Sequence, residues 1–145
     1  NNMKILENRH LKLWNPNAVG CWALLFTPIF GSYLLYKNAK QLNDLESQSK
    51  ARNWIIAGFA IWIISIFCMI QFPNNTGLTN GFSFWYLILW YFFLVRKQVE
   101  KLENHCSGHY LRFNQKEWFI SILIGVVFRA ILIGLSSGIV LFFAP

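Results

Sequence analysis

The segment Trp118 to Ala144 reads WFISILIGVVFRAILIGLSSGIVLFFA, and it decides the class of this protein. Over these 27 residues Arg129 is the only charged side chain. As a helix the segment would be roughly 40 Å long, which exceeds the roughly 30 Å hydrocarbon thickness of a bilayer. It therefore predicts a transmembrane helix that is tilted or begins in the interfacial layer. Arg129 lies near its middle, where a cation is costly and is usually functional or specifically paired.

The composition of the whole chain agrees with a membrane protein. Of 145 residues, 55% are hydrophobic and 13% are charged, whereas soluble domains average roughly 25% charged residues. We treat residues 1–145 as a single membrane domain. The net charge of +7 lies almost entirely in the polar segments, which favours contact with the anionic surface of a bilayer. A nucleic-acid partner is not expected, because no basic patch is interleaved with exposed aromatic residues on a soluble fold.

Two more apolar runs are predicted to span the membrane, at 54–72 and 82–95. The first is the cleaner of the two, with 19 residues bounded by Trp54 and Phe72. The second is only 14 residues long and eight of them are aromatic, so it would need a thinned bilayer, extension into its flanks, or protein contacts. Between the spans, 37–53 is predicted to form an interfacial helix that leads into the next span, because Leu35, Leu42 and Leu45 recur at helical spacing.

The apolar run 18–36 is interrupted at its middle by Thr27, Pro28 and Gly31. Proline removes a backbone donor and clashes with the preceding turn. The run is therefore either one kinked span or two half-helices that form a re-entrant hairpin. Ahead of it, 3–17 is predicted to be an interfacial segment, a short helix lying on the membrane, because apolar residues share it with Lys4, Arg9 and Lys12.

The charges between the runs predict the topology. Lys and Arg number three before Ala18, four between Tyr36 and Trp54, none between Phe72 and Phe82, and five between Val95 and Trp118. The positive-inside rule then favours an all-α, polytopic protein of the bacterial inner (cytoplasmic) membrane, with a re-entrant or kinked N-terminal helix pair plus three transmembrane helices. The N-terminus would be cytoplasmic and the C-terminus periplasmic. The alternative is four full spans with both termini outside.

Residues that could carry chemistry are few. His105, Cys106 and His109 form the only cluster typical of a metal site, but Gly108 weakens a helix there and no fourth ligand is evident. We therefore predict no metal, and a solvated loop instead. The chain has no Gly-rich phosphate loop and no acidic residue in its apolar runs. We expect no catalytic residues, no cofactor and no enzymatic activity.

A face of small residues on the last apolar run predicts helix packing. Ala130, Gly134 and Gly138 recur every four residues, which lets a second helix approach closely. Ser136 and Ser137 could donate hydrogen bonds across such a contact, and Arg129 lies near the same side. The contact could be with a partner protein, with a second copy of the chain, or with helices of the same molecule.

Residues 13–42 resemble the N-terminal pattern of small, functionally uncharacterised bacterial multi-span membrane proteins. The shared features are Trp14 to Asn17 (WNPN), Leu24 to Gly31 (LLFTPIFG) and the basic helix around Lys37 to Lys40. The resemblance implies a membrane location and no particular activity.

These observations favour a non-enzymatic inner-membrane protein that binds another membrane protein through its helices. The concrete hypothesis is an immunity protein that neutralises a membrane-acting or pore-forming bacterial toxin, by analogy with other small multi-span proteins. The alternatives are an accessory or assembly subunit of a larger membrane complex, and a small oligomeric channel for anions lined by Arg129.

Overall fold

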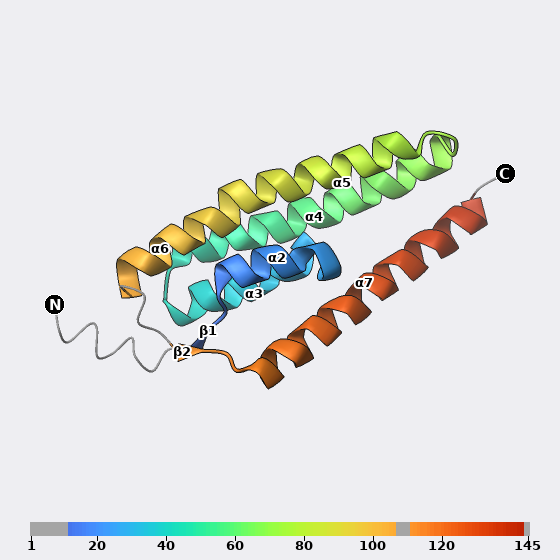
Figure 1. Cartoon of the computed structure of the whole chain (residues 1–145). Helices are drawn as coiled ribbons and strands as arrows, with labels where there is room; N and C mark the ends of the chain where they lie inside the picture. The colour runs from blue at the N-terminus through green and yellow to red at the C-terminus, as the bar shows by residue number, and fades with distance from the viewer. Residues whose placement is uncertain (1–11, 107–110, 144–145) are drawn as a thin grey trace.

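The computed structural model describes residues 12–106 and 111–143 of the chain. Nearly all of these residues are helical, as the all-α prediction requires (Figure 1). In chain order the elements are β1 (Lys12–Leu13), α2 (Pro16–Phe26), α3 (Pro28–Gln41), α4 (Leu45–Gln71), α5 (Thr76–Trp90), the π-helical turn η1 (Tyr91–Val95), α6 (Arg96–Cys106), β2 (Leu111–Arg112) and α7 (Gln115–Phe143).

Helices α2 and α3 form an antiparallel hairpin. The Asn15 side chain caps α2 by accepting the Asn17 N–H. At the open end of the hairpin, the Trp14 N–H donates to Asn38 Oδ1 at 2.8 Å and Asn38 Nδ2 donates to the Trp14 carbonyl at 2.6 Å. Both of these groups are buried, so the two hydrogen bonds satisfy polar atoms that water cannot reach. The start of α2 and the end of α3 therefore lie side by side.

A tight turn separates α3 from α4. Asn43 has a φ of 53°, and the side chain of Asp44 accepts the Ser47 N–H as the N-terminal cap of α4. The interfacial helix expected over 37–53 is therefore wrong: its first part belongs to α3 and its second part to α4. Asparagine tolerates left-handed backbone and aspartate is a preferred cap, which together reverse the chain here.

One long helix is continuous from Thr76 to Cys106, because α5, η1 and α6 follow one another without a break. It contains the aromatic run expected at 82–95 and extends beyond it at both ends, so the short run does not limit the length of the helix. The π-helical turn packs against α2: a side chain on Gly20 would meet the Tyr91 ring at 3.0 Å and Val95 Cγ1 at 3.1 Å.

Helices α4 and α7 are each long and apolar enough to cross a membrane, with 27 and 29 residues. Only 17% and 11% of their most apolar windows are buried. A core helix of a soluble protein would bury most of that surface, so the uncovered apolar faces indicate a membrane environment.

Two short strands join the beginning of the described chain to the segment that precedes α7. Lys12 pairs with Leu111 and Leu13 pairs with Arg112 in a parallel bridge. This differs from the interfacial helix expected over 3–17, of which residues 3–11 lie outside the described part. The pairing places β1 beside the entry to α7, where Lys12 also forms an ion pair with Glu117.

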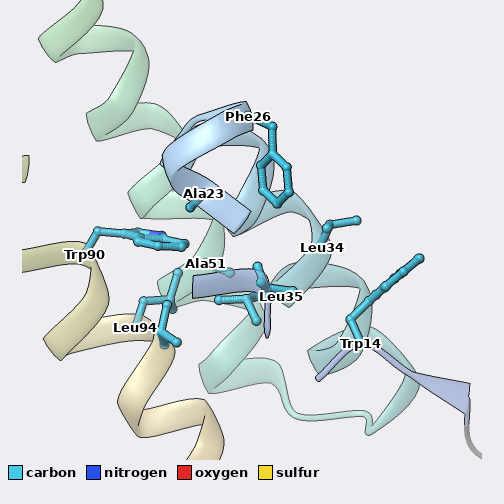
Figure 2. Packing of buried hydrophobic residues seen from close by; sticks show 10 residues of the cluster. Trp14, Ala23, Phe26, Leu34, Leu35, Ala51, Trp90 and Leu94 are labelled. Atoms are coloured by element: carbon cyan, nitrogen blue, oxygen red, sulfur yellow. The ribbon is translucent and has the colours of Figure 1, made fainter. Parts of the chain in front are cut away.

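The buried core surrounds the hairpin (Figure 2). Trp90 is fully buried and donates from Nε1 to Ser32 Oγ at 2.7 Å. Gly31, expected to take part in the helix break, instead lies inside α3 directly under this ring, since a Cβ there would lie 2.8 Å from Trp90 Cζ2. The rest of the cluster is apolar and comes from the hairpin, α4 and η1, with Phe26, Leu35, Ala51 and Leu94 among its members.

The two ends of the bundle differ in charge. We call the end with the α3–α4 turn and the last turns of α6 the charged end, and the end with the α4–α5 connection and the last turn of α7 the neutral end (Figure 1). The open end of the hairpin lies at the charged end, where Gln98 Nε2 donates to the Leu35 carbonyl at 3.3 Å. Because α2 has 11 residues, or roughly 16 Å, the hairpin fills only that half of the bundle.

Candidate functional site

The tip of the hairpin leaves backbone carbonyls without helical partners. Thr27 has a φ of 88° and a ψ of 146°, so helical geometry stops there. The Leu24 carbonyl would normally accept from the residue four positions later, which is Pro28 and has no N–H. The Thr27 N–H serves only the Ala23 carbonyl, at 2.9 Å. The sequence signal for this break is Thr27-Pro28.

Arg129 of α7 supplies the missing donors. Its Nη1 donates to the Leu24 carbonyl at 2.6 Å and to the Leu25 carbonyl at 3.1 Å. The last carbonyls of a helix also carry the negative end of its dipole, equivalent to about half an electronic charge. The structure therefore shows what pairs with this arginine inside the molecule: the C-terminus of α2, rather than an acidic side chain.

A glycine lets α7 come close enough for this contact. Gly125 is buried, and a Cβ there would lie 2.4 Å from Phe26 Cβ and 2.9 Å from Phe30 Cδ1. Any side chain would push α7 away from the hairpin. Phe128, one position before Arg129, packs against Phe30 with ring centroids 6.3 Å apart. The regular spacing in the sequence instead predicts close packing at Gly134 and Gly138.

A cleft of about 840 Å³ lies beyond the hairpin tip, toward the neutral end. Thr27, Pro28 and Arg129 line it together with the facing sides of α4, α5 and α7. Its walls are mostly apolar, with Ile61, Ile66, Met69, Phe84, Leu87, Leu132, Ile133 and Val140 among them. The cleft occupies the half of the bundle that the short hairpin leaves unfilled.

Several hydroxyl groups border the cleft. Trp62 Nε1 of α4 donates to Ser136 Oγ of α7 at 2.9 Å, and that hydroxyl donates to the Leu132 carbonyl at 2.7 Å. This chain of hydrogen bonds ties α4 to α7. Ser65 Oγ and Thr27 Oγ1 are buried and have no hydrogen-bond partner in the part of the chain that the structure describes. Ser137 also lines the cleft and is exposed.

The small-residue face of α7 is uncovered. A Cβ on Gly134 or Gly138 would have no neighbour within 4 Å among the described residues. Ala130, on the same face, is exposed. Packing against the protein's own helices, one of the alternatives for this face, is therefore not what the structure has. The surface faces lipid or a partner.

The metal-like cluster falls where little is described. His109 lies outside the described residues, as do the side chains of His105 and Cys106, although the backbone of α6 continues to Cys106. Within residues 12–106 and 111–143, no group of three His, Cys, Asp or Glu side chains is arranged to hold a metal ion.

An ionic network holds the charged end together. Lys101 Nζ lies 3.0 Å from Asp44 Oδ2 and 3.0 Å from Glu46 Oε2, and it also donates to Ser47 Oγ. Burial opposes ionisation of Asp44, but hydrogen bonds from the Ser47 hydroxyl and N–H, together with the Lys101 ammonium, outweigh it and lower the pKa of Asp44 to about 2. The network joins the start of α4 to α6.

Comparisons with known proteins add no assignment, because no family model, curated protein or solved structure matches this chain.

Proposed function

We propose that this protein is a non-enzymatic membrane protein that receives an apolar helix of another membrane protein in the cleft between α4, α5 and α7. The observation that carries the proposal is the cleft itself, about 840 Å³ of mostly apolar space beyond the tip of a hairpin that is too short to fill it. A helix bundle with one half-length member leaves a gap of the shape that another apolar helix would fill.

The surroundings of the cleft support a protein occupant. Gly134 and Gly138 lie on α7 outside the residues that line the cleft, and a Cβ on either would have no neighbour within 4 Å among the described residues. Small residues allow the backbones of two helices to approach, which is the main source of helix affinity in lipid. This face could therefore contact a partner separately from the cleft.

The arrangement in the membrane follows from the charges. We place the charged end in the cytoplasm and the neutral end outside the bacterial inner membrane, with α4, α7 and the continuous α5–η1–α6 helix as three spans. The α2–α3 pair then enters from the cytoplasmic side and returns. In this orientation the cleft opens toward the periplasmic half of the bilayer, which is where a toxin that inserts from outside would first expose its helices.

Immunity against a membrane-acting toxin is therefore the specific function we propose. An accessory subunit of a resident membrane complex would use the same cleft for a permanent partner. The two differ in what occupies the cleft: a toxin helix that arrives after attack, or a subunit that is present at all times.

Site-specific photo-crosslinking tests the proposal. A photoreactive phenylalanine analogue replaces Ile133, which lines the cleft, or Ile131, which faces away from it on the same helix. The two isoleucines are 56% and 55% exposed, so they form a matched pair. We expect an adduct with one defined membrane protein from position 133 and none from position 131.

The identity of the adduct then separates the functions. A toxin encoded beside this protein's gene, together with toxin sensitivity in cells that lack the protein, supports immunity. A subunit of a resident complex supports the accessory role, and an adduct of twice the mass of this chain shows self-association. Equal crosslinking from positions 133 and 131 contradicts a binding cleft.

A further inference from the structure

Among the residues that the structure describes, the positive charge of Arg129 is only partly compensated. The acidic residues in the described part are Asp44, Glu46, Glu100, Glu103 and Glu117, all at the charged end. The nearest along α7 is Glu117, twelve residues away or roughly 18 Å of helix, and it pairs with Lys12. The C-terminus of α2 offers about half a charge.

The guanidinium also has donors left over. Both hydrogen bonds to the hairpin come from Nη1, and Nε and Nη2 have no partner among the residues the structure describes. These two nitrogens form one edge of the guanidinium, which can hold a carboxylate with two parallel hydrogen bonds. Arg129 is exposed and lines the cleft, so this edge can be reached from it.

The depth of Arg129 decides which kind of anion can reach it. It lies 14 residues, roughly 21 Å, from the start of a helix of 29 residues, and so at about the middle of the bilayer. A phospholipid entering from the neutral end keeps its headgroup at the surface and brings only its acyl tail to that depth. A transmembrane helix, in contrast, can carry an acidic side chain at its midpoint.

We infer that the helix received by the cleft carries an aspartate or glutamate near its middle, which pairs with the free edge of Arg129. This inference rests on the proposed function and names the chemistry of the partner. Burying an acidic residue in lipid is costly for the partner alone, so the pairing would favour the complex and reject apolar helices that lack the acid.

Synthetic helices of known sequence test the inference. Peptides of about 20 leucine and alanine residues with lysines at both ends carry aspartate, asparagine or leucine at the centre. Each is mixed at increasing amounts with the full chain in zwitterionic vesicles at mildly alkaline pH. The photoreactive group at Ile133 reports entry into the cleft, and the group at Ile131 reports random contact.

We expect the aspartate peptide to reach half of its maximal crosslinking at about tenfold lower concentration than the asparagine peptide. Arg129→Gln should abolish this preference, because glutamine carries no charge. Arg129→Lys should retain part of it. Arg52→Gln, which removes the same charge at the charged end, should leave it unchanged.

Three outcomes overturn the inference in different ways. If all three peptides crosslink at position 133 with equal affinity and none crosslinks at position 131, the cleft binds helices but does not select for an acidic side chain. The proposed function then stands and the inference fails. If no peptide favours position 133 over 131, the cleft does not receive helices and both fail. A preference for aspartate that persists in Arg129→Gln also refutes the role of this arginine.

Discussion

Pro28 removes the N–H that would serve the Leu24 carbonyl, and Arg129 replaces it from another helix. In lipid an unsatisfied carbonyl costs more than in water, because no solvent can bond to it. The arginine is itself costly in the membrane, and the carboxyl end of α2 offsets part of that cost. The broken helix and the arginine therefore compensate each other. The guanidinium supplies donors to the unpaired carbonyls of α2, and these carbonyls supply acceptors to the guanidinium.

This arrangement predicts opposite effects of Arg129→Leu on insertion and on folding. Insertion should be retained or improved, since the change removes a penalty of roughly 3 kcal/mol on insertion scales. The folded state should lose about 1–3 kcal/mol, because two carbonyls lose a donor. Unfolding of the purified protein in mixed detergent micelles measures the loss. Arg52→Leu at the charged end is the control, and equal stability of the two variants would contradict the role of Arg129.

Asp44 gives a prediction of pH dependence. Its pKa is lowered from 3.8 to about 2 in the folded protein. A carboxyl group with a lowered pKa contributes stability that is fully present above its unfolded pKa and is lost as the pH falls through its folded pKa. Asp44→Asn keeps a capping side chain but removes the charge, so it should cost on the order of 1–2 kcal/mol at neutral pH.

The difference between Asp44→Asn and the unaltered protein should shrink between about pH 4 and pH 2 and vanish below that range. Thermal unfolding in detergent across the pH series measures it. A stability difference between the two proteins that stays constant down to the lowest pH would show that the effect of the substitution does not come from the carboxylate.

At the level of elements, the close packing of α7 against the α2–α3 hairpin depends on one glycine, and two other glycines of α7 take no part in it. Gly125 lies against Phe26 and Phe30, whereas Gly134 and Gly138 contact nothing within 4 Å. The sequence pattern pointed to the free pair, because a regular four-residue spacing is easy to see. A single glycine opposite a phenylalanine gives no periodic signal, and only the tertiary structure identifies it.

Three substitutions on α7 separate these roles. Gly125→Ala should destabilise the protein by about 1–3 kcal/mol, since the new methyl group overlaps Phe26. Gly134→Ala and Gly138→Ala should leave stability unchanged or raise it by up to about 1 kcal/mol, because alanine favours helix. Unfolding measurements on all three variants show which glycines the stability of the protein depends on. If Gly134→Ala and Gly138→Ala instead weaken the crosslink from Ile133, the free glycines contact the partner.

The elements that the sequence predicted well are those whose limits depend on local chemistry. The apolar helices around 54–72 and 118–144 follow from length and the need to satisfy the backbone in lipid. The extent of the Thr76–Cys106 helix was missed, because the change from aromatic to charged residues was interpreted as the end of an element. A helix crossing from lipid into water changes composition without changing its backbone. The cleft could not be predicted, since it depends on the length of α2 relative to the helices around it.

At the level of the whole molecule, the bundle consists of two different halves. The charged half contains the hairpin, the buried aromatic core and the Lys101 network, and the buried polar groups of Asn38 and Trp90 are hydrogen-bonded there. The other half has only α4, α5 and α7 around the cleft. The buried core lies in the first half, so the second half can stay open for a partner while that core remains intact.

The same asymmetry leads to a prediction of topology. Trp14 is bonded to Asn38 across the open end of the hairpin, so the chain entering α2 and the chain leaving α3 lie on one side of the molecule. If α2 and α3 are too short to cross, the basic N-terminal segment, the α3–α4 turn and the basic segment before α7 all face the cytoplasm, as the positive-inside rule favours.

Single reporter cysteines at Lys4, Asn43 and Asn74, in a chain whose own cysteines are replaced, test this topology with a membrane-impermeant thiol reagent on intact cells. We expect labelling at position 74 alone, and labelling at all three positions once the membrane is permeabilised. Labelling of position 4 from outside, with position 43 protected, would instead mean that the first apolar run crosses the bilayer and that the protein has four spans.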